Sequence, residues 1–174
     1  PDRTLEIVVE NTRELLHRLD QEELDFALVE GSFDKSRYGY RRFQSAPFVG
    51  LCHRDHPFAS RKVTGEALDD QSVILREAGS GTRAIFEKSL QESGYSLDKI
   101  GRIICVNNFA LIVRMVSENL GVSFAYSAVA AGHPELTTFS LEGLSEQREF
   151  NFVYLNGTHA DQLIDEIFPN SSCQ

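Results

Sequence analysis

The sequence lacks any long apolar run, although the chain has 174 residues and a hydrophobic content of 41%. No stretch approaches the roughly 20 consecutive apolar residues that a helix needs to cross a bilayer. No charged segment followed by an apolar core marks a secretory signal peptide either. The composition is typical of a globular chain that buries a hydrophobic core, as one domain or as two small lobes. We therefore expect a protein that stays in the cytoplasm.

Cysteine is scarce, since the chain contains only Cys52, Cys105 and Cys173. No two of them have C-x-x-C spacing, so the sequence predicts neither a disulfide framework nor a zinc site. Cys52 and Cys105 lie in strand-like runs, and we expect both to be small buried side chains. No metal ion and no cofactor is expected.

Positive charge is in deficit, with 17 Lys and Arg residues against 26 Asp and Glu residues and a formal net charge of −9. A segment that binds DNA directly usually gathers its basic residues on one face or along one helix. Here the basic residues are scattered from Arg13 to Arg148. Because an acidic chain of this kind repels phosphate groups, we expect that this segment does not itself contact DNA.

The motifs of common hydrolases and metalloenzymes are missing. The histidines are scattered, none lies in an H-E-x-x-H motif, and no serine lies in a G-x-S-x-G motif. Acidic pairs such as Asp69-Asp70 are typical of solvated helix ends and loops. The sequence therefore does not predict an enzyme. An α/β enzyme that acts on a small molecule remains an alternative, which a nucleophile and a base within hydrogen-bonding distance would favour.

What the sequence does contain is an alternation of strand-like and helix-like segments. Asn11 or Thr12 is a plausible cap for the first helix, and Gly121 is a plausible end for a later one. A polar stretch, residues 34–42, interrupts the alternation. Strands that alternate with helices predict a mostly parallel sheet that helices cover on both faces. We expect strands at residues 4–10, 25–29, 47–52, 72–75, 100–106, 122–126, 139–141 and 149–155.

Polar residues follow several of these strands at the point where each strand ends. In a parallel sheet the carboxyl ends of the strands meet at one edge, where open α/β folds bind ligands. The most informative segment runs from Glu77 to Arg83 and contains Gly-Ser-Gly-Thr-Arg between a strand and a helix. The free N–H groups at the start of that helix, two hydroxyls and the Arg83 guanidinium are the groups that an anion needs. The segment matches neither a P-loop nor G-x-G-x-x-G.

The same residues have a purely structural interpretation. Ser80 or Thr82 could cap the helix while Gly79 makes the turn, and Asn108 and Ser127 could be simple N-caps. Tyr126 could bury its ring and satisfy its hydroxyl group on the backbone. The sequence leaves both interpretations open.

Five stretches of the chain resemble, in order, the effector-binding domain of LysR-type transcriptional regulators. The His-Pro after the strand at residues 47–53 and the Gly-Ser-Gly-Thr-Arg segment are the most specific of them. The stretches are LDFALVE at 24–30, PFVGLCHRDHPFA at 47–59, VILREAGSGTR at 73–83, VSENLGVSFAYS at 116–127, and the last strand with its terminal helix.

The resemblance implies an α/β fold of the type 2 periplasmic-binding-protein-like class, in which two crossing strands join two lobes. Lobe 1 would contain residues 1–48 and 150–174, and lobe 2 residues 49–149. The first strand and helix of lobe 1 in this family have no counterpart in the sequence. The effector would lie in the cleft between the lobes, against Gly31, Ser32, Ser80, Gly81, Thr82, Arg83, Asn107, Asn108, Tyr126 and Ser127.

The resemblance also implies partners. The effector would be a small polar molecule, such as a carboxylate or another anion, and a separate helix-turn-helix domain would bind DNA. The domain would form a homodimer, with a tetramer as an alternative for the full-length protein. A type 2 solute-binding protein of a transporter, which shares the fold, is the competing hypothesis.

Overall fold

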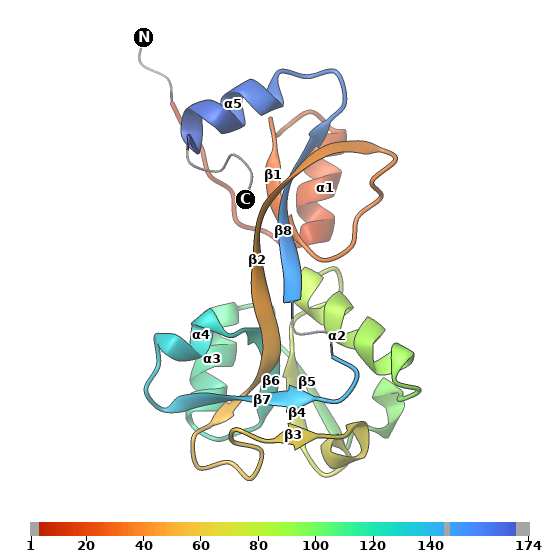
Figure 1. Ribbon diagram of the computed structural model, residues 1–174, viewed down its shortest axis with the longest axis vertical. Coiled ribbons are helices and arrows are strands. Elements are labelled where there is room, and N and C mark those ends of the chain that lie inside the picture. The colour runs from red at the N-terminus through yellow and green to blue at the C-terminus, as the bar shows by residue number, and fades with distance from the viewer. Residues whose placement is uncertain (1–3, 145–146, 170–174) are drawn as a thin grey trace.

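Two long antiparallel strands form the spine of this computed structural model, which describes residues 4–144 and 147–169. β2 (Tyr38–His53) pairs with β8 (Gln147–Leu155) from Tyr38↔Leu155 to Pro47↔Gln147, with a register shift at Phe43. Both strands run through a narrow waist between an upper and a lower body (Figure 1). The expected pair of crossing strands is therefore present.

The upper body contains α1 (Thr12–Asp20), β1 (Ala27–Glu30), α5 (Ala160–Ile167) and the adjoining ends of β2 and β8. β1 pairs antiparallel with β8, from Ala27↔Val153 to Glu30↔Phe150. The apolar face of α1 packs on this sheet and contributes Leu19 to a small core. The other buried members of that core are Ala27, Val29, Tyr38 and Val153.

The lower body is built on a mixed sheet. β4 (Ser72–Leu75) pairs in parallel with β5 (Arg102–Cys105) and with β6 (Val122–Tyr126), and β6 pairs antiparallel with β2. β7 (Leu136–Leu141) pairs antiparallel with β2 and in parallel with β3 (Lys62–Val63). The helices are α2 (Gly81–Glu92), α3 (Phe109–Ser117), α4 (Ala128–Ala131) and the 3₁₀ turns η1 (Gly65–Leu68) and η2 (Leu97–Lys99).

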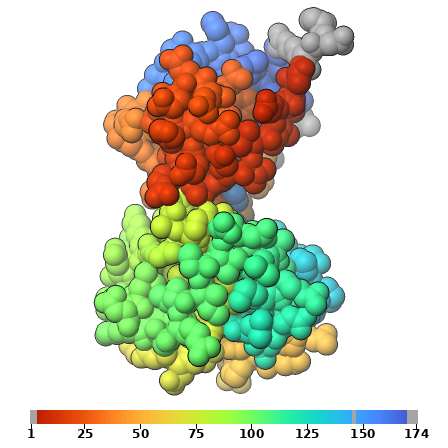
Figure 2. Space-filling model, turned by 180° about the vertical axis from the view of Figure 1, so that it is seen from behind, coloured from red at the N-terminus to blue at the C-terminus, as the bar shows by residue number. Residues whose placement is uncertain are grey.

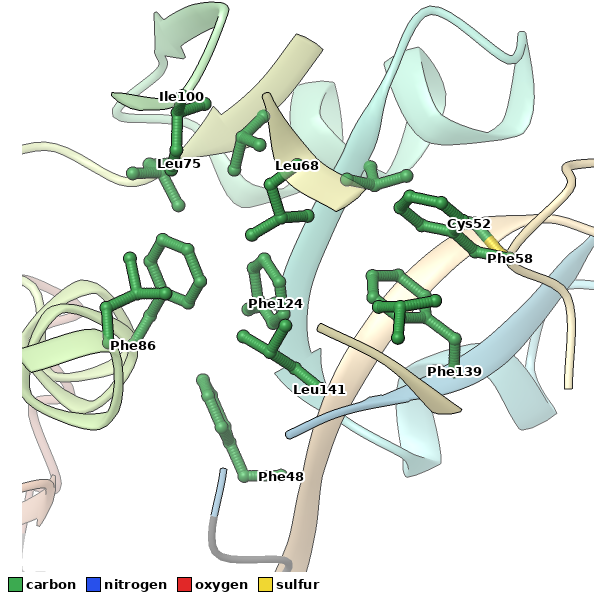
Figure 3. Packing of buried hydrophobic residues seen from close by; sticks show 14 of the residues in the cluster. Phe48, Cys52, Phe58, Leu68, Leu75, Phe86, Ile100, Phe124, Phe139 and Leu141 are labelled. Atoms are coloured by element: carbon green, nitrogen blue, oxygen red, sulfur yellow. The ribbon is translucent and has the colours of Figure 1, made fainter. Parts of the chain in front are cut away.

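Aromatic side chains dominate the largest core, which lies between the lower sheet and α2 (Figure 3). Phe86 of α2 stacks on Phe124 of β6 with ring centroids 4.1 Å apart. Phe139 meets Phe124 edge-on and also contacts Phe58. A second cluster on the other side of the sheet packs α3 through Ile112, Val113 and Val116. The α2 helix is thus held rigidly, with its N-terminus directed at the waist.

Several expectations about strands were wrong. Residues 4–10 form no strand, and Leu5, Ile7 and Val9 are 59%, 75% and 91% exposed. Alternating apolar residues become a strand only where a neighbouring strand accepts their backbone hydrogen bonds, and the described residues provide none beside this segment. Conversely, β2 already begins at Tyr38 within the polar stretch, because β8 supplies a partner there.

The sheet and one cysteine also differ from expectation. The sheet is mixed instead of mostly parallel, since both crossing strands pair antiparallel with their neighbours. Cys52 is buried as expected, but Cys105 is exposed. The reason is that β5 is the last strand in the pairing order and most of its side chains face solvent. Cys173 lies outside the described residues.

Candidate functional site

The two bodies touch where the end of β1 meets the N-terminus of α2. We call this the interbody contact and define it by Glu30, Gly31 and Gly81. A Cβ atom added at Gly81 would lie 2.6 Å from Cγ of Glu30 and 2.9 Å from Oγ1 of Thr12. Gly31 has φ +82°, a conformation that glycine adopts without strain. Glycine at both positions therefore allows the backbones to approach closely.

The Glu30 carboxyl lies at the start of α2, where the sequence predicts a site for an external anion. Burial raises the pKa of Glu30, and interactions with the Tyr126 hydroxyl, the backbone N–H of Thr82 and the Arg76 guanidinium oppose part of the rise. The Tyr126 hydroxyl lies beside the Glu30 carboxyl, but the two do not have the distance and angles of a hydrogen bond, and no other described residue bonds to this hydroxyl. A side chain of the protein itself thus occupies part of the α2 N-terminus.

The polar groups of the Gly-Ser-Gly-Thr-Arg segment are mostly engaged within the protein. The hydroxyls of Ser80 and Thr82, both buried, lie 2.9 Å apart in a hydrogen bond. Nε of Arg83 donates to Glu87 over 2.7 Å, and its Nη1 donates to the carbonyl of Arg76. The bond to Glu87 is the largest cause of a raised Arg83 pKa. Arg83 therefore already has a carboxylate partner.

The remaining predicted residues are distributed unevenly. Tyr126 lies close to the interbody contact, with its ring against Phe48 and Phe150. Asn108 caps α3, since its Oδ1 accepts from the N–H of Leu111. Asn107 is exposed, and Ser127 is the N-cap residue of α4 without a side-chain cap bond. The structure thus brings Gly31, Ser80, Gly81, Thr82 and Tyr126 near Glu30. Six of the predicted residues line neither of the pockets described next: Thr82, Arg83, Asn107, Asn108, Tyr126 and Ser127.

Two pockets flank the interbody contact at the waist. The larger has a volume of about 410 Å³ and the smaller about 260 Å³. Gly31 and Ser32 line the larger pocket, and Ser80 and Gly81 line the smaller one. Figure 2 shows from behind how the segment that leads into α1 rests on the lower body at this waist. Asn11 contributes to that contact, because its Nδ2 donates to Oε1 of Glu77 over 3.1 Å.

Sequence reasoning missed several residues of these pockets. Arg76 lines the smaller pocket, whereas Lys35, Lys88, Arg148 and Asn151 line the larger one. Lys35, Lys88, Arg148 and Asn151 lie in none of the motifs that the sequence offered, and Arg76 lies within the stretch 73–83 but was not singled out. The pairing of β8 with β1 and β2 brings Arg148 and Asn151 to the waist, whereas Arg76 follows β4 and Lys88 lies on α2. Asn11 and Thr12, which the sequence predicted as a helix cap, also line the smaller pocket. The cap prediction is confirmed, since Oδ1 of Asn11 accepts from the N–H of Glu14.

Neither a metal-binding group nor a membrane-spanning helix is found in the part of the chain that the structure describes. No group of three or more His, Cys, Asp or Glu side chains is arranged to hold a metal ion there. Among these residues, no helix has both the length and the apolar character needed to cross a membrane. The alternative of an α/β enzyme would be favoured by a nucleophile within hydrogen-bonding distance of a base. The hydroxyls of Ser80 and Thr82 bond to each other and not to a basic side chain.

Two bodies joined by crossing strands, with pockets at the waist, define a type 2 periplasmic-binding-protein-like domain. Comparison with known proteins identifies its family: the sequence profile named "LysR substrate binding domain" matches residues 1–168, so the chain belongs to that family. Residues 1–3 and 145–146 of this match lie outside the described part of the structure.

The curated relatives are transcriptional regulators. The chain is 22% identical over 158 residues to HTH-type transcriptional regulator CysL of Bacillus subtilis, a match that spans 88% of this chain and 52% of the relative. It is 25% identical over 158 residues to HTH-type transcriptional activator CmpR of Synechocystis, spanning 88% and 51%. The chain therefore covers about half the length of the curated relatives that it matches. These relatives favour the regulator over the transporter protein.

Solved structures agree on the fold. The Synechocystis CcmR regulatory domain in complex with 2-PG superposes with a TM-score of 0.77 at 21% identity, covering 93% of this chain and 80% of that one. The effector binding domain of QuiR in complex with shikimate gives 0.73 at 18% identity, covering 90% and 75%.

Proposed function

We propose that this domain is the sensing half of a LysR-type transcriptional regulator. It binds a small polar or anionic metabolite in the cleft between the two bodies, and binding modulates how a helix-turn-helix domain elsewhere in the full-length protein acts on DNA. The similar domains of CcmR and QuiR, in complex with 2-PG and shikimate, support a small polar ligand. The domain releases its ligand chemically unchanged.

The observation that carries this proposal is the interbody contact with a pocket on each side. A ligand that enters either pocket touches both bodies, because residues of each body line both pockets. The conformations of the domain differ in the angle between the two bodies. Such a ligand binds one of these conformations more tightly than the others and increases its population. We place the bodies as lobe 1, residues 1–48 and 150–174, and lobe 2, residues 49–149. The hydrophobic clusters support this division except at its border, where Phe48 and Phe150 pack in the lower cluster.

Of the contacts that the sequence nominated around the cleft, Gly31 and Ser32 line the larger pocket and Ser80 and Gly81 line the smaller one. The other nominated residues, which are Thr82, Arg83, Asn107, Asn108, Tyr126 and Ser127, line neither pocket. Tyr126 is the nominated residue that the substitution below tests, because its buried hydroxyl lies beside the Glu30 carboxyl at the interbody contact. We further propose that the protein acts in the cytoplasm as a homodimer, with a tetramer as the alternative for the full-length form. In this proposal, it contacts DNA only through the helix-turn-helix domain.

The proposed sensing function is tested by measuring whether charged and uncharged polar metabolites bind to the domain. A thermal-shift screen should find at least one compound that stabilises the domain, because a ligand that binds only the native state raises its stability. Tyr126→Phe should weaken that compound about ten-fold, the cost of losing one hydrogen bond to a charged group. Tyr95→Phe is the matched control, since Tyr95 also has a buried, unpartnered hydroxyl but packs by Gly65 in the lower core.

Two outcomes would count against this proposal. One is a screen in which no polar compound stabilises the domain. The other is a bound compound whose affinity falls equally in Tyr126→Phe and Tyr95→Phe, which would indicate a general loss of stability and no contact in the cleft.

A further inference from the structure

Of the two pockets, the larger one has the charge and the size that an anionic ligand needs. Its charged lining residues are Lys35, Lys88, Arg148 and Glu149, an excess of two positive charges. The smaller pocket contains Glu10, Glu30 and a single basic residue, Arg76. Ligand sites usually measure about 300–1,000 Å³. The larger pocket, at about 410 Å³, falls inside that range, and the smaller, at about 260 Å³, falls below it.

Within the described residues, Arg148 of the larger pocket lacks the carboxylate partner that Arg76 and Arg83 have. Arg76 makes two short bonds to Glu77, of 2.8 and 3.0 Å. Arg148, in contrast, bonds only to the Ser89 hydroxyl among the described residues, and its Nε is buried without a partner. Burying a guanidinium without a carboxylate is costly unless another anion compensates it. Lys88 is exposed and lies 3.9 Å from Glu92, near the limit for an ion pair.

A buried acceptor lies in the same pocket. Asn151 is only 4% exposed, and its Oδ1 has no hydrogen-bond partner among the described residues. An unsatisfied buried carbonyl needs a donor, such as a hydroxyl group. Phe33 and Ile85 add apolar surface to the pocket.

We propose that the larger pocket binds a small anion that also carries at least one hydroxyl group. The anionic group meets Arg148, Lys88 and Lys35, and a hydroxyl group donates to Oδ1 of Asn151. This inference rests on the proposed sensing function and specifies both the pocket and the chemical class of the ligand. It excludes the α2 N-terminus as the anion site, because the Glu30 carboxyl is already there.

Three probes of similar size separate the two requirements. Glycerol 3-phosphate has the anion and the hydroxyl groups, propyl phosphate has only the anion, and glycerol has only the hydroxyl groups. Glycerate, propionate and glycerol form the same series with a carboxylate. In calorimetry, the hydroxylated anion of at least one series should bind about ten-fold more tightly than its counterpart without hydroxyl groups, and glycerol should bind more weakly still.

Substitutions locate the site. Lys88→Ala and Arg148→Gln should each weaken the hydroxylated anion about ten-fold or more, and Lys88→Arg should restore most of the affinity. Lys62→Ala is the matched control, because Lys62 is similarly exposed and also makes a long ion pair, here to Glu142, but lies outside the pocket. Since Lys88 is exposed, its variants should fold even if Arg148→Gln does not. Backbone amide shifts on binding should concentrate at residues 31–35, 84–88 and 147–151.

The outcomes separate the inference from the function on which it rests. If a polar compound binds and Tyr126→Phe weakens it, but Lys88→Ala and Arg148→Gln do not, the sensing function stands and the larger pocket is wrong. The same holds if the compound that binds is neutral or cationic. If none of these probes binds, and no other polar compound binds either, both proposals fail.

Discussion

At the scale of single residues, Glu30 is the side chain whose protonation most affects the interbody contact. Its carboxyl is the last side chain of β1, yet it lies at the N-terminus of a helix from the other body. A helix N-terminus favours a negative charge, while burial favours the neutral acid. Since burial is the larger effect on Glu30, the native state holds the proton more tightly than the unfolded chain does.

This balance predicts a pH dependence. Because the folded-state pKa is raised, the native protein binds more protons than the unfolded chain, and Glu30 lowers stability as the pH rises above its ordinary pKa of 4.5. Glu30→Gln removes the titration. The difference in unfolding free energy, variant minus wild type, should therefore be larger at pH 7.5 than at pH 4 in urea titrations. An equal difference at both pH values would contradict the raised pKa.

The cysteines give a second prediction at this scale. Cys52 is fully buried, and burial raises the pKa of its thiol to about 11, whereas Cys105 is exposed. Because the thiolate is the reactive form, a thiol reagent should modify Cys105 in the native protein and Cys52 only after unfolding. A chain in which Cys173 is replaced by Ser, with the modified positions read by mass spectrometry, tests this. Equal rates at Cys52 and Cys105 would contradict the difference in their burial.

At the scale of elements, α1 and α3 both begin with an asparagine cap, but only one of the two cap side chains also bonds to a residue of the other body. Within the described residues, the Asn108 side chain accepts a bond only from the N–H of Leu111, in α3. Asn11 accepts from the N–H of Glu14 and also donates to Glu77 of the lower body. The first cap therefore stabilises one helix, and the second also connects the two bodies.

Alanine substitutions distinguish these roles. Asn108→Ala should cost about 1 kcal/mol of unfolding free energy, the usual value for an N-cap. Asn11→Ala should cost more, because it also removes the bond to Glu77, and it should alter ligand affinity. Ser127→Ala is the control, since Ser127 makes no side-chain cap bond, and should change stability by less than about 0.5 kcal/mol. If Asn11→Ala costs no more than Asn108→Ala, the bond to Glu77 contributes nothing measurable in solution.

At the scale of the whole molecule, the two bodies have unequal cores. Five buried residues form the upper cluster, against 17 and seven in the two lower clusters of the described residues. Within those residues β1 also pairs on one side only, with β8, and it ends the pairing order. A small core and an unprotected edge both lower the free energy of local opening.

Hydrogen exchange should show this asymmetry. Amides of α1 should exchange faster than those of β4 and β6, which lie inside the lower sheet. Leu19→Ala, which removes a fully buried side chain from the small cluster, should cost about 2–5 kcal/mol and speed exchange chiefly in the upper body. Uniform protection across both bodies would mean that the crossing strands couple them into one cooperative unit.

The sequence by itself determined the order of the helices and most strands and a cap at Asn11 or Thr12, and its resemblance to a known family implied the two crossing strands. These features depend on local patterns of apolar, capping and turn residues, which hold wherever the segment lies. Only the tertiary structure decided that residues 4–10 form no strand, that Cys105 is exposed, that Glu30 lies at the start of α2, and that Arg148 and Asn151 share a pocket. Each of these depends on which distant segment lies beside the residue, because pairing, burial and charge compensation arise between elements and not along the chain.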